Sequence, residues 1–158
     1  MNNPLIKTIP ESDLLRVIAV QRQSYPPELW EDEPVFRDKR RLFPEGALGW
    51  YQDGVLQAYF FVHPWRKNKT APLFTDTMSL PENPDCLYFH DLAISPAARG
   101  KGAGRSLVEA AFALAEQNGL KHFSLVAVQN SESFWQKFGF TPYKTLTYSG
   151  VPAVHMVK

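Results

Sequence analysis

The chain has 158 residues and a net charge of +1, from 17 Lys and Arg against 16 Asp and Glu. This length fits one domain over residues 1–158, and the near-neutral charge excludes a basic field for holding nucleic acid. The single cysteine, Cys86, excludes a disulfide within the chain and a cysteine-based zinc cluster. We find neither a signal-peptide pattern nor a long apolar run, and therefore expect a soluble, cytoplasmic protein with no membrane partner.

The first part of the chain predicts one strand and two helices. Residues 5–9 favour a short strand. A helix begins after Ser12 or Asp13, whose side chains can accept a hydrogen bond from a free backbone N–H, and it ends before the Pro26–Pro27 pair. Residues 33–42 predict a second, strongly charged helix.

The middle of the chain predicts strands. Asp53–Gly54 is the strongest short hairpin signal, and it joins strands at residues 48–52 and 55–63. Residues 75–79 favour a further short strand, and residues 86–94 predict a clear one.

The last part alternates the two kinds of element. We expect helices at residues 102–118 and 131–138, a strand at residues 121–128, and a closing hairpin of residues 140–148 and 151–157. Strands outnumber helices and the two are mixed along the chain, which is typical of an α/β or α+β fold with a mixed sheet.

Residues 95–107 hold the most informative pattern. A strand stops at Ser95–Pro96, three glycines follow at a spacing of two, and a helix then begins. The first turn of a helix presents unpaired N–H groups, and glycines let the backbone approach a ligand closely. With three basic residues beside it, this turn predicts a phosphate or pyrophosphate site. The glycines are Gly100, Gly102 and Gly104, and the basic residues are Arg99, Lys101 and Arg105.

The spacing excludes two common nucleotide motifs. A Walker motif needs Gly-Lys-Ser/Thr at the helix start, whereas Arg105 and Ser106 follow the last glycine here. A dinucleotide motif needs Gly-x-Gly-x-x-Gly, but its last position is Leu107 counted from Gly102 and Arg105 counted from Gly100. The alternative to a phosphate site is a flexible helix entry with solvated arginines.

Three segments together resemble the GNAT superfamily of acetyl-CoA-dependent N-acetyltransferases. Residues 99–104 match that family's Arg/Gln-x-x-Gly-x-Gly/Ala motif, residues 90–94 resemble its fourth strand, and residues 134–140 resemble its second motif. The likeness runs from about Ile6 to the C-terminus. It implies a single α/β (α+β) N-acetyltransferase domain. Its mixed, mostly antiparallel sheet has about six or seven strands, is flanked by about four helices, and splays between the fourth and fifth strands.

A closer likeness is to the arylalkylamine N-acetyltransferases, on residues 48–51, 89–94 and 138–140. It implies transfer of an acetyl group from acetyl-CoA, as co-substrate, to an arylalkylamine or other small hydrophobic primary amine by direct attack. By analogy with the family we expect a monomer or homodimer. We expect no metal, because four scattered histidines lack the spacing of ligands.

The resemblance assigns the cofactor to the strand at residues 90–94 and the glycine turn. The backbone of Leu92 and Ile94 is expected to pair with the pantetheine arm, and amides of the turn to cradle the pyrophosphate. For Ala93 and Ile94 plain core packing is the alternative. The residues assigned to the cofactor are Leu92, Ala93, Ile94, Arg99, Gly100, Lys101, Gly102, Ala103, Gly104, Arg105 and Ser106.

His90 is the strongest candidate for chemistry. Imidazole titrates near neutrality and suits removal of a proton from an ammonium group, directly or through water. Strand alternation predicts that it shares a face with Tyr88 and Leu92, opposite Phe89, Asp91 and Ala93. The resemblance implies a catalytic histidine at His90, with Tyr88 where the arylalkylamine enzymes carry another histidine. The alternative is a hydrogen-bonded structural histidine.

Trp135 departs from the family pattern. Many members carry there a tyrosine that protonates the departing thiolate, and an indole cannot do so because its N–H only donates. Water, Tyr143 or Tyr148 could substitute, or no general acid is needed. We expect Trp135 to pack against the cofactor arm. Asn130 is a further cofactor candidate, with a helix cap at Asn130 or Ser131 as the alternative.

Aromatic residues border the expected acceptor pocket, and core packing is the alternative for each of them. The acidic run at residues 28–33 could attract a cationic amine, although a solvated helix entry is the more ordinary interpretation. The expected pocket residues are Tyr25, Trp30, Tyr59 and Phe61.

Two alternatives to a small-molecule N-acetyltransferase remain open. The departure at Trp135 favours a catalytically degenerate module that binds acyl-CoA without turnover. An acceptor amine on a protein or peptide would keep the chemistry and change the substrate class.

Overall fold

The computed structural model describes residues 3–75 and 78–158, which form a seven-stranded sheet with four α-helices. The sheet order is β1-β2-β3-β4-β5-β7-β6. Neighbouring strands are antiparallel except β4 and β5, which are parallel. The strands are β1 (Leu5–Thr8), β2 (Ala47–Gln52), β3 (Val55–Trp65), β4 (Cys86–Ile94), β5 (His122–Ala127), β6 (Thr141–Tyr148) and β7 (Val151–Val157). The helices are α1 (Leu14–Ser24), α2 (Glu33–Leu42), α3 (Ala103–Gln117) and α4 (Glu132–Gln136).

The fold class expected from the sequence is confirmed: a mixed, mostly antiparallel sheet with a parallel β4–β5 pair. The element order also follows the predicted one. The short strand expected at residues 75–79 is not present at Thr75, Met78 or Ser79, and residues 76–77 lie outside the described residues.

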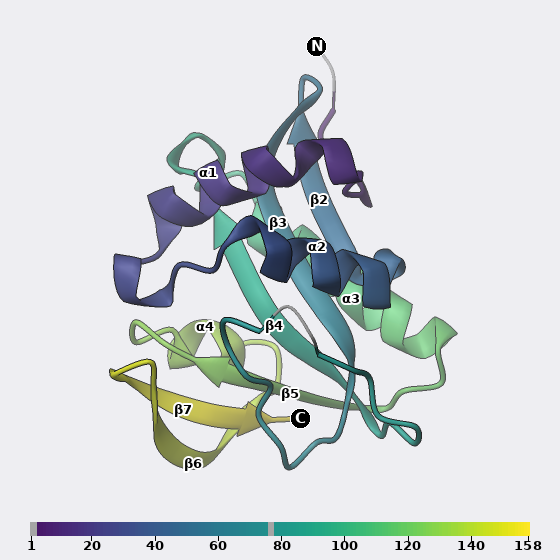
Figure 1. Ribbon diagram of the computed structural model, residues 1–158, viewed down its shortest axis with the longest axis vertical. Helices are drawn as coiled ribbons and strands as arrows, with labels where there is room; N and C mark the ends of the chain where they lie inside the picture. Colours follow the sequence, from purple (N-terminus) through teal and green to yellow (C-terminus); the bar gives the residue numbers. More distant parts are fainter. Residues whose placement is uncertain (1–2, 76–77) are drawn as a thin grey trace.

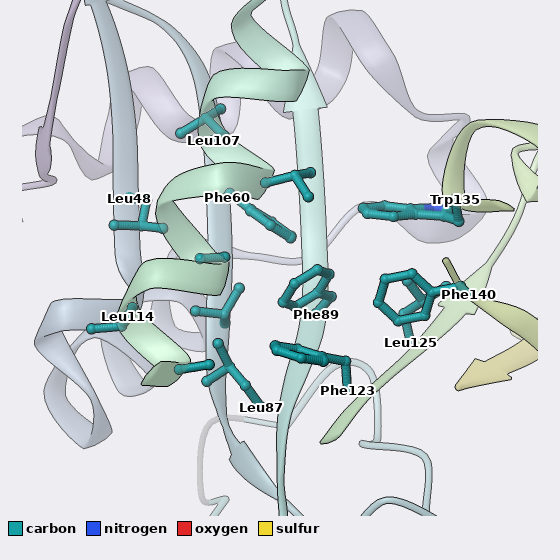
Figure 2. Packing of buried hydrophobic residues seen from close by; sticks show 14 of the residues in the cluster. Leu48, Phe60, Leu87, Phe89, Leu107, Leu114, Phe123, Leu125, Trp135 and Phe140 are labelled. Atoms are coloured by element: carbon teal, nitrogen blue, oxygen red, sulfur yellow. The ribbon is translucent and has the colours of Figure 1, made fainter. Parts of the chain in front are cut away.

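The helices cover both faces of the sheet, with α1 and α2 on one face and α3 on the other (Figure 1). The α3 side holds the larger aromatic core. Figure 2 shows Leu107 and Leu114 of α3 packed over the strands that carry Phe60 and Phe89, with Trp135 beyond them. Burying each such side chain contributes about 1.5–3 kcal/mol. This core fixes one face of β4 firmly against α3.

The β4–β5 pairing is short and then ends. Residues Cys86–Phe89 of β4 pair with residues 122–125 of β5, whereas β4 continues to Ile94. The second half of β4 therefore has its β5-facing edge open, which agrees with the splay that the family resemblance implies. This opening positions the site.

Candidate active site

A cavity of about 270 Å³ fills the space where β4 and β5 separate. Its walls come from the open edge of β4, the end of β5, α4 and the end of α1. It is lined by Ser24, Tyr25, Phe60, Phe89, His90, Asp91, Leu92, Ala93, Ile94, Arg99, Leu125, Val126, Val128, Gln129, Ser131, Phe134 and Trp135. The predicted cofactor residues of β4 and Arg99 are thus brought to one cavity.

The glycine turn leads from β4 into α3. Gly100 and Gly102 have φ angles of +76° and +78°, a left-handed backbone that favours glycine, and the space beside both Cα atoms is open. Gly104 lies in the first turn of α3, where a Cβ atom would come 3.0 Å from Ile94. Ala103 and Gly104 are buried, so their first-turn N–H groups are held in place rather than frayed. The turn presents backbone rather than side chains.

The basic residues of the turn separate in space. Arg99 lines the cavity. Lys101 is exposed, and so is Arg105, whose guanidinium lies 3.8 Å from Glu109 and over the ring of Phe138. Ser106 continues the helix, its N–H donating to the Gly102 carbonyl. Of the three predicted cations, Arg99 has the position that serves a ligand in the cavity.

The open edge of β4 already carries hydrogen bonds from the end of α1. Tyr25 Oη donates to the Leu92 carbonyl at 2.5 Å, and Ser24 Oγ shares its one hydrogen between the Ile94 and Val20 carbonyls, each 3.0 Å away. Leu92 and Ile94 are the backbone positions assigned from the sequence to the pantetheine arm. A carbonyl oxygen has two lone pairs, so each can still accept a second bond.

A second, smaller cavity of about 40 Å³ adjoins the first. The two share five lining residues, and the smaller one adds a carboxylate, aliphatic side chains and a tyrosine. It is lined by Tyr25, Leu29, Glu31, Leu73, His90, Asp91, Val126, Val128 and Tyr148. The site therefore has a larger compartment beside the glycine turn and a smaller one beside ionisable side chains.

A β-bulge lies at the junction of the two compartments. Phe61 of β3 pairs with Asp91, but the next residue, Val62, pairs with Phe89, so His90 is an extra residue on β4. A bulge of this kind changes where side chains point beyond it.

The bulge makes the simple alternation predicted for this strand wrong. Phe89 and Leu92, expected on opposite faces, both pack in the α3-side core. Asp91, expected opposite His90, instead joins it on the α1–α2 side, where His90 contacts Glu31. Two consecutive ionisable residues thus reach the same side of the sheet.

His90 forms a buried pair with Glu31, which follows the 3₁₀ turn Pro27–Leu29. Nε2 of His90 lies 3.2 Å from Oε1 of Glu31, and both side chains are almost completely buried. A carboxylate can only accept, so Nε2 carries the hydrogen and the neutral ring has its free lone pair on Nδ1. Among the described residues, that Nδ1 has no hydrogen-bond partner. The ring is thus held in the tautomer whose Nδ1 can accept a proton.

Glu31 is the residue that sequence reasoning placed wrongly. It was expected on a solvated helix entry, but its side chain is 2% exposed. Burial raises its pKa, yet His90, Lys39 and the Phe74 N–H together bring the pKa below its ordinary value. The Phe74 N–H donates to Oε2 at 3.0 Å, and Gln21 bonds both backbone groups of Glu31. Only the fold brings these distant segments together.

Asp91, which had no role assigned from the sequence, lies at both compartments. Tyr59 Oη donates to its Oδ2 at 3.0 Å. Burial and the Glu31 charge raise the pKa of Asp91 to about 7, against the hydrogen bond from Tyr59. Asp91 therefore exchanges its proton near neutrality. The pKa of the adjacent His90 is lowered by burial and then by Lys39, against the opposing effect of Glu31.

The predicted acceptor aromatics divide between cavity and core. Tyr25 lines both compartments. Tyr59 and Phe61 instead pack with Phe36 beneath α1 and α2, because β3 directs them into the core. Trp30 donates from Nε1 to the Tyr25 carbonyl at 2.7 Å and supports Tyr25 from outside the described cavities. The expected aromatic acceptor pocket is wrong at Tyr59, Phe61 and Trp30.

The three tyrosine candidates for an acid also separate. Tyr148 lines the smaller compartment and donates to the Ala71 carbonyl at 2.6 Å. Tyr88 is buried beside His63 and His90, and burial raises the pKa of both Tyr88 and Tyr148. Tyr143 is half exposed on β6 with its ring against His155, away from the described cavities.

Trp135 and Asn130 flank the larger compartment differently. Trp135 is 7% exposed, packs 5.9 Å from Phe89 between ring centroids, and lines the cavity. Asn130 is exposed with φ +57°, while its neighbours Gln129 and Ser131 line the cavity. Ser131 is the residue before α4, and its side chain makes no capping bond. The cap expected at Asn130 or Ser131 is therefore wrong for the side chain.

Within residues 3–75 and 78–158, no group of three His, Cys, Asp or Glu side chains could hold a metal ion. The helices of the same residues are too short or too polar to span a membrane.

Several solved structures share this fold over almost the whole chain. Ard1 from Thermoplasma volcanium has a TM-score of 0.80 and 17% identity, covering 98% of this chain and 96% of that one. Naa50 from Arabidopsis thaliana, solved with the bisubstrate analogue CoA-Ac-MVNAL, has a TM-score of 0.75 and 14% identity, covering 99% of each chain. The ribosomal-protein-S18-alanine N-acetyltransferase from Escherichia coli has a TM-score of 0.71 and 16% identity, covering 98% and 92%. At these identities the likeness shows a shared fold.

The family model assigns the chain to a family, whereas the likeness to solved structures shows only the fold. A search of curated proteins finds no match. The model of the acetyltransferase (GNAT) family matches residues 15–140, which include the splayed strands, the glycine turn, His90 and Asp91. The chain therefore belongs to the acetyltransferase (GNAT) family.

Proposed function

We propose that the protein, as one domain over residues 1–158, is an N-acetyltransferase that moves an acetyl group from acetyl-CoA to a small primary amine. One observation carries this proposal: the two compartments meet at His90 and Asp91. The larger one is lined by the open β4 edge and by Arg99, the residue directly before the glycine turn, which suit an extended thioester with a pyrophosphate. The smaller one has buried carboxylates, which suit an amine.

The proposed reaction is direct attack. An ammonium group loses one proton to His90 Nδ1 or to the Asp91 carboxylate, and the exposed nitrogen lone pair attacks the thioester carbonyl carbon. The attacking nitrogen loses its second proton to water. The carbon–sulfur bond then breaks and the sulfur leaves as a thiolate. A covalent route through Cys86 has little support, because burial and the Asp85 charge raise the pKa of that thiol to about 12.

The leaving thiolate is proposed to depart without a protein acid. The Trp135 indole has no acidic hydroxyl, and the Tyr148 hydroxyl already donates to Ala71. Burial also raises the pKa of Tyr148, followed by the charges of Tyr88 and Glu31, which makes it a poor acid. A thiol has a pKa of about 8.5, so its thiolate leaves tolerably unaided near neutral pH.

The acceptor proposed is a small hydrophobic primary amine. The smaller compartment measures about 40 Å³, and Leu29, Leu73, Val126 and Val128 give it aliphatic walls. The carboxylates at Glu31 and Asp91 complement an ammonium group. An arylalkylamine is the larger member of this class, and the loss of three expected aromatic walls favours acceptors smaller than it.

A bridge across this compartment favours a small acceptor over a peptide. Ser149 Oγ donates to the Glu28 carbonyl at 2.9 Å, joining the β6–β7 turn to the α1–α2 connection. Their sequence neighbours Tyr148 and Leu29 line the compartment. An extended peptide would have to displace this bridge, whereas a small amine would not. The peptide and protein acceptors in the names of Naa50 and the S18-alanine enzyme remain properties of those proteins.

The test is thiol release from acetyl-CoA against a panel of short aliphatic amines, phenylethylamine, tryptamine-like amines, polyamines, amino acids and short peptides. Turnover that favours short aliphatic amines is the expected result. Preference for peptides would keep the chemistry and overturn the acceptor class.

A second candidate function rests on Trp135, which stands where many relatives have an acidic tyrosine. On that interpretation the protein binds acyl-CoA and does not transfer the group. Tight acetyl-CoA binding by calorimetry, with no thiol release across the panel, would favour it, and Trp135→Tyr would be the variant in which to look for restored turnover.

A further inference from the structure

α2 carries a buried lysine that the proposed reaction has not used. The side chain of Lys39 is 2% exposed, and within the described part of the chain its Nζ atom has no hydrogen-bond partner. The nearest anionic atom is Oε2 of Glu31, 3.9 Å away. Burying an ammonium group without close hydrogen bonds is strongly unfavourable, so its position calls for a reason beyond packing.

Lys39 lies within a set of ionisable groups contributed by every element around it. The α1–α2 connection contributes Glu31, α2 contributes Asp38, β3 contributes His63, and β4 contributes His90 and Asp91. Around these groups, Tyr59 and Tyr25 face Asp91, and Tyr88 lies beside His90. Of these, Asp38 has its own partners: Arg41 at 2.6 Å and the Met78 N–H at 3.2 Å. Glu31 is therefore the anion that Lys39 can serve most directly.

The two neighbouring imidazoles both turn an unpaired nitrogen to the interior. His63 Nδ1 lies 3.0 Å from the Pro64 carbonyl, which can only accept, so His63 keeps its lone pair on Nε2. His90 donates from Nε2 to Glu31 and keeps its lone pair on Nδ1. Neither lone-pair nitrogen has a hydrogen-bond partner in the described residues. Protonating either ring would add a second positive charge close to Lys39.

We infer that Lys39 is a positioning residue of the proposed acetyl-transfer site, whose buried charge keeps Glu31 ionised and His90 neutral so that Nδ1 can take the proton of the amine. Only the identity of the proton donor, an amine substrate, rests on the proposed function. The effect of the Lys39 charge on the ionisation of Glu31 and His90 is a property of the protein without substrate.

The charges around His90 act in opposite directions. Burial lowers the pKa of His90, Lys39 lowers it further, and Glu31 raises it. Burial also lowers the pKa of His63, to about 3, and His90 and Lys39 add to this. Glu31 alone would favour an imidazolium, which has no lone pair for the amine proton. Lys39, whose Nζ lies 3.9 Å from the other carboxylate oxygen, Oε2 of Glu31, offsets this tendency toward an imidazolium.

The test is an NMR titration of the His90 ring in the substrate-free protein, assigned with His90→Gln. Lys39→Met removes the charge and retains most of the side-chain volume. We expect it to raise the pKa of His90 by about one unit, which is the usual size of the effect of one nearby charge. Arg37→Met is the matched control, because Arg37 lies exposed on the same helix and pairs with Glu11 and Glu33. A shift in Lys39→Met no larger than in Arg37→Met would overturn the inference.

A second pair of variants guards against misfolding of Lys39→Met, which leaves Glu31 buried without its cation. Glu31→Gln and the double variant Glu31→Gln/Lys39→Met differ by the lysine alone, and the double variant buries no unpaired charge of that pair. The pKa of His90 should be higher in the double variant by a similar amount. Equal values would contradict the inference.

The kinetic readout is separate. With an active acceptor, the acidic limb of kcat/KM against pH should move to higher pH in Lys39→Met by the same amount as the ring titration. Absence of turnover in the unmodified protein would overturn the proposed function and leave the NMR result to decide on Lys39.

Discussion

The two ends of the site are built from different parts of the polypeptide. The end beside α3 is made of backbone: Gly100 and Gly102 with open space beside them, and the first turn of a helix. The end beside α1 and α2 is made of side chains that are almost completely buried, with Glu31 and His90 in direct contact. Backbone N–H groups do not titrate, so their ability to bind a ligand does not change with pH. The chemistry of a buried pair of ionisable groups, in contrast, depends on which of the two carries a proton. The first end is thus suited to holding a ligand and the second to changing it.

The largest expected effect is at the side-chain end. His90→Ala removes the free Nδ1 and the partner of Glu31, and we expect kcat to fall by about 10²- to 10⁴-fold, as for loss of a general base. The acidic limb of the pH profile should also disappear, while the affinity for acetyl-CoA by calorimetry stays within about twofold. An unchanged pH profile would break the distinction between the two ends.

The next effect concerns stability and has a definite sign. Because the pKa of Asp91 is raised to about 7 in the folded protein, the folded state binds this proton more tightly than the unfolded chain. Its contribution is full below the ordinary carboxyl range, and it is lost as the pH rises through about 7. The stability gained by Asp91→Asn relative to the unmodified protein should therefore be larger at pH 8 than at pH 4, by about 3–4 kcal/mol. Urea denaturation at both pH values measures the difference, and equal differences would contradict it.

The third prediction tests the backbone end. Arg99→Ala should weaken acetyl-CoA binding by about five- to tenfold and leave kcat nearly unchanged, because Arg99 lines the cavity as a point of charge. Arg105→Ala is the matched control, since Arg105 is exposed and pairs with Glu109. Calorimetry with CoA measures both. Equal losses in the two variants would show that the charge acts through the general field rather than by position.

The smallest effect is at the edge of the acceptor compartment. Tyr148→Phe removes the hydrogen bond to the buried Ala71 carbonyl, and we expect it to lower the free energy of unfolding by about 1 kcal/mol. Turnover should change by less than about threefold if Tyr148 is not the acid. Tyr143→Phe, on the exposed side of β6, should change neither quantity. A hundredfold loss in Tyr148→Phe would instead make that hydroxyl catalytic.

The backbone end could be predicted from sequence because its signals are local. Ser95–Pro96, the glycine spacing and the start of α3 lie within a dozen residues, and turn and helix rules act at that range. The strands and their order were predictable for the same reason, with Asp53–Gly54 marking one hairpin. The splay followed from the family resemblance rather than from any local signal.

The side-chain end could not be predicted in the same way because its geometry depends on contacts between distant segments. Glu31 and His90 are 59 positions apart, and nothing beside Glu31 in the sequence distinguishes it from its solvated acidic neighbours. The sequence carries no signal for the bulge at His90 either, since a regular strand and a bulged strand have the same composition. Buried Lys39 follows the same pattern: a charged helix predicts exposure to solvent, and tertiary contacts decide which of its charged residues, here Asp38 and Lys39, are buried.

Because the β4–β5 pairing is short, the sheet has an additional open edge in its middle. The unpaired backbone groups of such an edge can hydrogen-bond to a strand of another chain. The bonds from Ser24 and Tyr25 to the Ile94 and Leu92 carbonyls put side chains where a foreign backbone would dock. The end of α1 therefore covers part of this interior edge. Another strand that paired with this edge would have to displace these side-chain bonds.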